Sequence, residues 1–246
     1  MMNVEMPVDA RTKPGILYEN MVAKTTPYTA RGVIWYQGES DDMPGLQPLY
    51  ADMMEGLICD WREAWGDMSM PFIQVQLPGW KTWMMQKNLD YSAIRHCQEE
   101  VTKRMEGVYM ASISDVGEEW DIHPKDKKTV GHRLALLARH YAYGEELLCE
   151  APRPEEMRRE GKQIIITFRH TGAGLKLAGE CVEALSVSIN GTEAAYTAKV
   201  QEDELIITLE KDEEKPVKID FAQGAWYLVN LYNEADIPAV PFSLEC

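Results

Sequence analysis

The spacing of apolar residues changes once along the chain, close to Gly144, and this change constrains the fold more than any other feature. Before Gly144, short apolar runs rich in β-branched residues alternate with longer segments of helical spacing. We predict strands at 32–37, 71–77 and 108–114, and helices at 46–65, 91–105 and 125–143, the last ended by Gly144. Strands that alternate with helices form βαβ units, so this part predicts an α/β fold with a parallel sheet buried on both faces.

After Gly144 the pattern becomes that of short antiparallel strands. Pro152, Pro154 and the charged stretch 155–162 indicate a boundary between two domains. Beyond it, alternating apolar runs predict strands at 164–168, 185–189, 194–200, 205–209 and 217–221, with Asn190-Gly191 as a hairpin turn. We therefore expect an α/β domain over residues 1–150 and a small β-sandwich-like domain over residues 151–246.

A polar segment, Gln37-Gly38-Glu39-Ser40-Asp41, directly follows the first predicted strand. In open α/β sheets, ligands bind beyond the carboxyl ends of the strands. The segment is therefore predicted to face a substrate. From the residues alone, an ordinary strand exit with a solvated glutamate and aspartate explains it equally well.

A second polar segment, Asp121-Ile122-His123-Pro124, lies between the third predicted strand and the last predicted helix. The His123 imidazole can act as a general base at neutral pH if a carboxylate orients it, and Asp121 is the nearest candidate. Pro124 restricts His123 to extended backbone and suits the first turn of the following helix. A His–Asp pair with a purely structural role is the more frequent outcome for such a spacing.

Composition excludes several classes of partner. The net charge of −15 argues against binding to nucleic acid and to anionic membrane surfaces. No apolar run approaches the roughly 20 residues of a membrane span, and residues 1–11 do not resemble a signal peptide, so we expect a cytoplasmic protein. The five cysteines are far apart and the histidines lack metal-ligand spacing, so we expect no disulfide framework, no metal and no cofactor.

Several motifs taken together resemble the sialate O-acetylesterase family, a group of SGNH-type serine hydrolases. The principal ones are Trp35-Tyr36-Gln37-Gly38-Glu39-Ser40, Asp121-Ile122-His123-Pro124 and Gly131-His132-Arg133-Leu134-Ala135. Others follow in the family's order at 17–23, 60–62, 71–77, 230–233 and 238–242. The resemblance implies a partial three-layer α/β/α fold and removal of acetyl groups from acetylated sugars.

The resemblance also implies roles for individual residues. His123 would be the general base and Asp121 its orienting acid, with three other carboxylates in reserve: Asp115, Glu118 and Glu119. The Gln37 side chain and the Gly38 backbone would donate to the oxyanion, and Glu39 would bind a hydroxyl or support these groups. Asp41 stands where many relatives have asparagine, and an aspartate cannot donate as an amide does.

The serine nucleophile expected from the resemblance is missing. The family carries it on a Gly-x-Ser segment well before the Trp-Tyr-Gln-Gly-Glu motif, but residues 1–31 contain no serine. Ser40 belongs to the motif itself and is interpreted as a loop or capping hydroxyl. The remaining serines of the α/β part, Ser69, Ser92, Ser112 and Ser114, lack a glycine-flanked strand-to-helix setting. We therefore expect a shortened or decayed esterase with little activity of its own.

Three questions stay open at this point. An acetyl xylan esterase would use the same groups, and a non-catalytic sugar-binding or interaction module is the alternative from another class. The sugar would stack on an aromatic ring of the 80–83 loop or on Trp120. Without the nucleophile-bearing strand, Val33, Ile34 and Trp35 would lie at an open sheet edge, so we expect either self-association or a need for a separate N-terminal polypeptide.

Overall fold

The computed structural model describes residues 13–26, 28–43, 45–81 and 91–246 of the chain. The first part contains α1 (Ile16–Asn20), η2 (Val22–Lys24), β1 (Val33–Trp35), η3 (Glu39–Asp41), η4 (Gln47–Leu49), α2 (Tyr50–Trp65), β2 (Phe72–Val75), α3 (Ser92–Arg104), β3 (Val108–Ala111) and α4 (Lys127–Tyr141). The second part contains β4 (Arg153–Glu160), β5 (Gln163–Arg169), β6 (Lys176–Leu177), β7 (Leu185–Ile189), β8 (Thr192–Glu193), β9 (Tyr196–Gln201), β10 (Glu204–Leu209), β11 (Val217–Phe221), β12 (Leu231–Tyr232) and β13 (Phe242–Glu245). No helix in these ranges is long and apolar enough to cross a bilayer.

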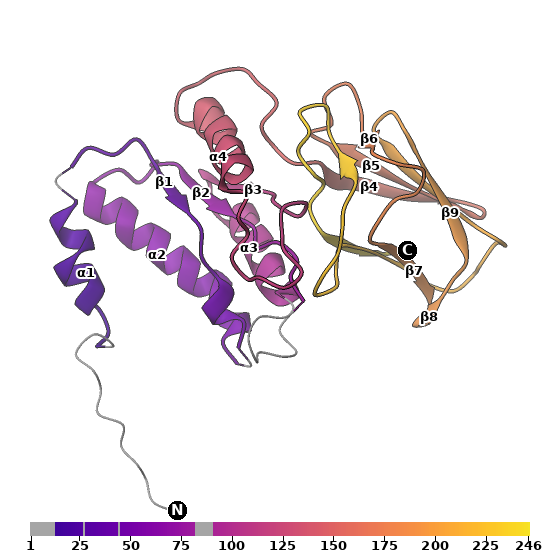
Figure 1. The fold of residues 1–246 in the computed structure, drawn as a ribbon, viewed down its shortest axis with the longest axis horizontal. Coiled ribbons are helices and arrows are strands. Elements are labelled where there is room, and N and C mark those ends of the chain that lie inside the picture. The colour runs from indigo at the N-terminus through magenta and orange to yellow at the C-terminus, as the bar shows by residue number, and fades with distance from the viewer. Residues whose placement is uncertain (1–12, 27, 44, 82–90) are drawn as a thin grey trace, which may run out of the picture.

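The first part is built on a parallel sheet with the strand order β1-β2-β3. Apolar residues of α2 and α3, including Ile58 and Ile94, pack with Phe72 on one face of the sheet. Those of α4, including Leu134, pack with Val75 on the other face. Figure 1 shows α2 and α3 on one side of the three strands and α4 on the opposite side. The predicted α/β fold with a parallel sheet is confirmed.

The strand β1 lies at the edge of this sheet, because in the described part of the chain it pairs only with β2. The side chain of Ile34 is 64% exposed, whereas Val33 and Trp35 are partly buried against the apolar cluster beneath α2 and α3. One apolar residue of the edge strand is therefore left facing solvent.

The helix α4 begins later than the sequence pattern predicts. The carboxylate of Asp126 accepts hydrogen bonds from the Thr129 amide (3.0 Å) and hydroxyl (2.6 Å), so it forms the N-cap and Lys127 is the first helical residue. The expectation that Pro124 lies in the first turn is therefore wrong, and Pro124 is buried before the cap. At the other end the helix stops at Tyr141, and Gly144 follows with a φ of 75°.

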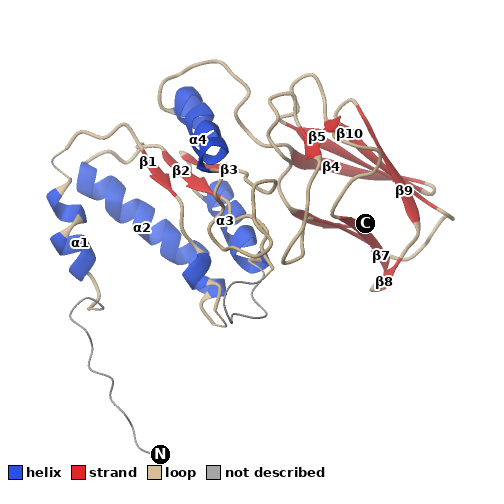
Figure 2. Cartoon of the chain, in the orientation of Figure 1, coloured by secondary structure: helices blue, strands red, loops and turns tan. Residues whose placement is uncertain are grey.

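The second part is a sandwich of two four-stranded antiparallel sheets, β4-β5-β10-β9 and β13-β11-β7-β8 (Figure 2). Ile166 and Ile207 of one sheet and Val187 and Ile219 of the other lie in one apolar core. The five predicted strands are present with small shifts of their ends. The hairpin turn has Asn190 and Gly191 at φ values of 51° and 74°.

The charged stretch 155–162, which the sequence pattern indicates as part of a domain boundary, is mostly a β-strand. Most of it forms β4, which pairs with β5 from Arg153 opposite Arg169 to Glu160 opposite Gln163. The strand lies at the edge of its sheet, and only Met157 of its central residues packs against the sandwich core. Charged residues are tolerated there because they face solvent.

Residues 222–242 return from the sandwich and contact the first part. The carbonyl of Ala225 accepts a hydrogen bond from the Trp80 amide (2.8 Å), and that of Ala239 accepts one from the Ser114 hydroxyl (3.2 Å). The Asp236 carbonyl accepts one from Arg133 (3.3 Å). Carbonyl groups of this one segment therefore join the second part to the first.

Candidate active site

The glycine after β1 occupies a place that excludes any side chain. Gly38 is buried and has a φ of 147°. A Cβ atom there would lie 3.0 Å from a methyl of Ile94 and 3.2 Å from a methyl of Leu77. Both the backbone conformation and the packing require glycine, so the strand exit is held tightly against α3 and the end of β2.

The Gln37 backbone is fixed by two buried side chains. Its carbonyl accepts hydrogen bonds from the Tyr50 hydroxyl (3.1 Å) and from the Gln98 amide (3.3 Å). Gln98 also donates to the Val75 carbonyl and accepts from the Leu77 amide (2.9 Å), so one side chain joins the ends of β1 and β2. The Gln37 side chain donates to Asp41 (2.5 Å), which leaves its second N–H for another acceptor.

Three tyrosines around this exit remain protonated at neutral pH. Burial, and then the Glu39 carboxylate, raise the pKa of Tyr36 far above its usual value. Burial raises the pKa of Tyr50 to about 12. Burial, with Glu39 and Asp42 adding to it, raises the pKa of Tyr91 still further. None of these phenols can therefore serve as a general base at neutral pH.

The His123 segment presents an exposed imidazole beside a carboxylate. The backbone amide of His123 donates to Asp121 Oδ1 (2.9 Å), and the ring Nδ1 lies 3.5 Å from the same oxygen. The His123 amide, and then Lys125 and the His123 ring, hold the pKa of Asp121 below its usual value. The His123 side chain is 69% exposed, so the ring faces solvent, where a substrate could reach it.

The three carboxylates considered as alternatives to Asp121 bind other groups. Asp115 forms a bidentate ion pair with Arg133, with N···O distances of 2.6 and 2.8 Å, and the Arg133 side chain is only 6% exposed. Glu118 accepts from the Lys125 amide (2.9 Å), and Glu119 pairs with Lys81 (2.8 Å). The geometry therefore favours Asp121 as the residue that orients His123.

Both predicted segments follow strands of the parallel sheet, β1 and β3, at their carboxyl ends. Tyr36 from the β1 exit and Ile122 from the His123 segment pack against the same apolar cluster, which contains Leu77 and Trp80. The Lys127 ammonium group at the start of α4 lies 4.8 Å from the centre of the Tyr36 ring. The β1 exit thus contacts the start of α4, and it shares an apolar cluster with Ile122 of the His123 segment. Among the described residues, no hydrogen bond joins Gln37 to Asp121.

The hydroxyl groups of several serines form hydrogen bonds within the fold. Ser112 and Ser114 are buried, lie 3.3 Å apart through their hydroxyls, and Ser114 also donates to Ala239. Ser69 bonds to Asp67 (2.7 Å). Ser40 differs, because it is exposed on η3 immediately beyond β1 and Gly38.

The aromatic residues proposed for sugar stacking have different environments. Trp80 is 2% exposed and packs on Tyr91 at a ring distance of 5.2 Å, so its role as a stacking platform is excluded. Trp83 lies outside the described residues. Trp120 is 64% exposed, with the Lys81 ammonium group 5.0 Å from its ring centre. Of these three, only Trp120 offers an exposed ring in the structure described.

Sequence reasoning missed the two buried polar residues that hold the site in place. Gln98 is fully buried on the same face of α3 as Ile94 and Val101, and a polar residue at that spacing is a usable signal. Arg133 anchors the strand β3 exit through the Ser112 carbonyl (3.1 Å) and Asp115. In the described ranges, no group of three or more histidine, cysteine or acidic side chains is placed to hold a metal ion.

Comparison with known proteins identifies the family. Residues 8–139 match the family described as "Carbohydrate esterase, sialic acid-specific acetylesterase". The sialate O-acetylesterase of Mus musculus is 33% identical over 169 residues, which is 61% of this chain and 30% of the mouse protein. The Homo sapiens enzyme is 34% identical over 174 residues, 62% of this chain and 32% of the human protein.

A solved structure shows the same arrangement over nearly the whole chain. The crystal structure of a carbohydrate acetylesterase from Xanthomonas citri superposes with a TM-score of 0.82 at 29% identity, covering 96% of this chain and 56% of that chain. The matches span 30% and 32% of the mouse and human proteins, about a third of their length. Because the matched family region, residues 8–139, is more than half of the 246 residues, the chain belongs to the sialic acid-specific acetylesterase family of carbohydrate esterases.

Proposed function

We propose that this chain carries the base and oxyanion-binding part of a carbohydrate O-acetylesterase of the sialate type. The observation that carries the proposal is the His123–Asp121 pair, with the ring exposed and its Nδ1 3.5 Å from the carboxylate. The pair follows β3 and the residues Gln37 and Gly38 follow β1, so both come after the carboxyl ends of parallel strands. Membership of the acetylesterase family implies a carboxylic ester hydrolase. The same proposal includes a three-layer α/β/α fold of the SGNH type.

The proposed reaction is acyl transfer through a serine. The serine hydroxyl attacks the acetyl carbonyl, His123 accepts the hydroxyl proton and later returns it to the departing sugar oxygen, and Asp121 stabilises the imidazolium. The second N–H of the Gln37 amide and the backbone N–H of Gly38 support the negative charge on the carbonyl oxygen. Water then attacks the acetyl-serine as His123 takes its proton, the bond from the acetyl carbon to the serine oxygen breaks, His123 returns the proton to that oxygen, and acetate leaves.

We assign the role of nucleophile to none of the serines that the structure describes. Ser40 is the exposed hydroxyl nearest to Gly38 in sequence, and we propose that it supports the η3 turn and does not attack. On this proposal the isolated chain turns over very slowly. Loss of the serine removes on the order of a million-fold in rate in triad enzymes.

The substrate we propose is a sugar that carries an O-acetyl group, with its ring stacked on Trp120. Supporting this, Trp120 is 64% exposed and directly precedes Asp121. Aromatic faces bind the apolar face of a sugar ring, while Glu39 accepts from a hydroxyl. An acetylated xylose chain would use the same groups, so the choice between sialate and xylan is left to experiment.

A further part of the proposal concerns assembly. We propose that the open edge at β1 pairs with another strand, either from a second copy or from a separate polypeptide that also supplies the serine. Supporting this, β1 has one strand partner in the described part of the chain and Ile34 is 64% exposed. An unpaired strand edge next to exposed apolar surface favours such pairing.

Binding and turnover measured separately test the function. The chain is titrated with a 9-O-acetylated sialoside and with an acetylated xylo-oligosaccharide, and resonances of Gln37, Gly38 and His123 are followed by NMR. We expect the sialoside to shift these resonances, the shifts to weaken several-fold in Trp120→Ala, and acetate release to remain close to the uncatalysed rate.

Two outcomes contradict the proposal. If neither acetylated sugar shifts the Gln37 and His123 resonances, the acetylesterase site is wrong. If the chain releases acetate at ordinary enzyme rates, and a serine-directed phosphonate labels Ser40 in the wild type but not in Ser40→Ala, then Ser40 is the nucleophile and the assignment of an absent serine is wrong.

A further inference from the structure

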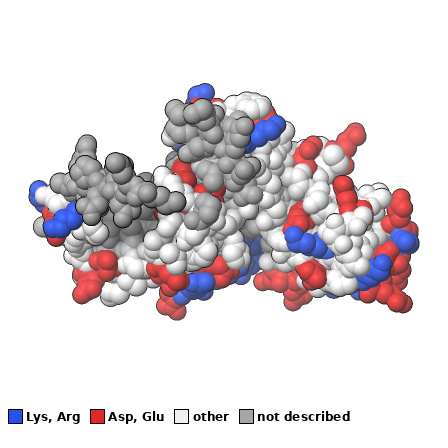
Figure 3. Space-filling model, turned by 90° about the horizontal axis from the view of Figure 1, so that it is seen from below, with Lys and Arg blue, Asp and Glu red and all other residues white. Residues whose placement is uncertain are grey.

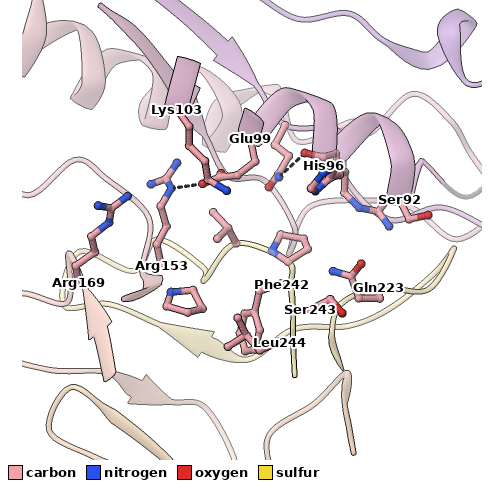
Figure 4. Close-up of a pocket in the computed structure, with 15 residues that line it drawn as sticks. Ser92, His96, Glu99, Lys103, Arg153, Arg169, Gln223, Phe242, Ser243 and Leu244 are labelled. Atoms are coloured by element: carbon pink, nitrogen blue, oxygen red, sulfur yellow. Dashed lines mark hydrogen bonds and ion pairs between the residues drawn. The ribbon is translucent and has the colours of Figure 1, made fainter. Parts of the chain in front are cut away.

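A pocket of about 290 Å³ lies between α3 and the sandwich, and it contains none of the residues placed in the candidate active site. One wall is formed by α3, with Glu99 and Lys103, and the opposite wall by Arg153, Arg169 and Phe242. Figure 4 shows Lys103 extending from α3 into the pocket beside Glu99, and the side chains of Arg153 and Arg169 rising toward it from the strands below. Lys103 is paired with Glu100 (3.0 Å), so the charge available to a ligand in this pocket depends mainly on the two arginines.

The two arginines are direct cross-strand partners in the β4–β5 register. Like charges opposite each other in an antiparallel pair repel and destabilise the sheet unless they are neutralised. Arg153 is neutralised by Glu150 (2.6 Å) and Glu99 (3.0 Å), and its side chain is 7% exposed. Arg169 is exposed, and no hydrogen bond or ion pair of its guanidinium exists within the described ranges. The pocket thus holds one arginine without a counter-charge.

The same pocket holds an acceptor without a donor. Glu99 uses Oε1 to bind Arg153, while its Oε2 is buried and has no hydrogen-bond partner in the part of the chain described. A buried carboxylate oxygen is costly to leave unpaired, so a donor from a ligand would be favoured there. Phe242 and Leu244 add an apolar surface beside these groups.

The cationic character of the pocket contrasts with the rest of the molecule. The chain has a net charge of −15, and acidic side chains are spread along the face in Figure 3, including the end formed by the sandwich. Unneutralised positive charge at one place in such a chain selects anions, because charge complementarity mainly determines which ligands are excluded.

We propose that this pocket binds a sugar-sized hydroxylated carboxylic acid, such as a uronic acid residue. Its carboxylate lies against Arg169 and Lys103, one hydroxyl donates to Glu99 Oε2, and the ring packs on Phe242. The planar guanidinium of Arg169 suits the two oxygens of a carboxylate. The site is separate from the acetylesterase site, and its existence does not depend on ester hydrolysis.

Three probes test the proposal on the 246-residue chain: sodium D-glucuronate, D-glucose and inorganic phosphate, each followed by calorimetry and NMR. We expect saturable binding of glucuronate that shifts resonances of Glu99, Arg169 and Phe242. Phosphate binds more weakly, since it lacks the ring, and glucose does not bind. Glucuronate binding weakens as salt rises, because the contact is ionic and partly exposed.

Variants at exposed arginines provide the matched comparison. Arg169→Gln weakens glucuronate binding at least about tenfold, as expected for loss of a charge-assisted hydrogen bond. Arg169→Lys retains part of the affinity. Arg139→Gln, which removes an exposed arginine of α4 away from the pocket, leaves the affinity unchanged. Melting curves show whether each variant is folded.

The proposal is overturned if glucuronate does not bind, if glucose binds as tightly, or if Arg169→Gln binds like the wild type. Shifts confined to Gln37 and His123 would place the ligand in the acetylesterase site and also overturn it. Phosphate binding as tight as glucuronate would show that the ring and Glu99 contribute nothing, which contradicts the sugar acid as the ligand.

Discussion

At the scale of single residues, the candidate site depends on groups that touch no substrate. Gly38 provides a backbone that no other residue adopts easily, and Gln98 joins the ends of β1 and β2 through its side chain. The sequence predicts Gln37, Gly38 and His123 as site residues because they follow strands. It could not predict the role of Gln98, because that role arises from three backbone groups brought together only by the fold.

Gly38→Ala tests how tightly the strand exit is held. We expect a loss of about 2 to 4 kcal/mol in the free energy of unfolding, because the positive φ is unfavourable for alanine and the Cβ crowds Ile94 and Leu77. Urea unfolding measures it. Gly56→Ala is the control: Gly56 lies within α2 with open space around it, so alanine should stabilise by roughly 0.5 to 1 kcal/mol. Equal effects of the two changes would contradict this account.

At the scale of secondary-structure elements, strands and helices were predicted correctly where buried apolar residues form a run or recur at regular spacing. The prediction failed where an element lacks such a pattern. The strand β2 is buried throughout and was predicted from its apolar run. The strand β4 has the sequence Arg-Pro-Glu-Glu-Met-Arg-Arg-Glu, and it forms because Arg153 meets two carboxylates and Met157 reaches the core. Long-range pairing of this kind leaves no periodic signal in the local sequence.

Arg153→Met tests the electrostatic contribution of β4. Removing the guanidinium leaves Glu99 and Glu150 as buried carboxylates without a counter-charge, so we expect destabilisation of about 3 to 5 kcal/mol. Arg158→Met on the same strand removes an exposed arginine paired with Glu160 and Glu204, and we expect a change of less than about 1 kcal/mol. Chemical unfolding of both variants gives the difference; similar values would mean that burial of the pair is unimportant.

His170, just after β5, gives the fold a dependence on pH. Burial lowers its pKa, and Arg153 and Arg169 add to this, while Glu150 and Glu155 oppose it. The unfolded state therefore binds the proton more readily than the native state, so stability is complete above the usual histidine pKa of about 6.5 and falls as pH drops below it.

Unfolding at pH 7.5 and pH 5.5 measures this effect. We expect the loss of stability between the two pH values to be smaller in His170→Asn than in the wild type. Asparagine suits the φ of 62° at this position, so the substitution preserves the backbone. An identical loss in both proteins would show that other groups cause the pH dependence.

At the scale of the whole molecule, the family and the two-part α/β and antiparallel arrangement were predicted from the order of motifs and the change in periodicity. The pocket between α3 and the sandwich was not, because its residues come from positions 76–103, 153–169 and 223–244. Such a site depends on how two separately patterned regions pack together, and neither pattern contains that information.

The open edge of the parallel sheet at β1 predicts that copies of the chain associate with one another. We expect the purified chain to form dimers or larger species in sedimentation experiments as its concentration rises, through the β1 edge. Ile34→Lys should shift the protein toward monomer, since it places a charge on the edge strand. Leu228→Lys changes a residue of nearly equal exposure, 63% against 64%, in the segment 222–242 and outside β1, and should have no effect. A stable monomer at every concentration would contradict this proposal.

The return of residues 222–242 to the first part also affects how the chain can fold during its synthesis. The amide of Trp80, the hydroxyl of Ser114 and the guanidinium of Arg133 all bond to carbonyls in that late segment. A ribosome releases the N-terminal half long before it makes those carbonyls. The nascent α/β part must therefore wait, with these three donors open to water, until residues 222–242 have been made, and a stop codon near residue 150 would leave it permanently without those carbonyls.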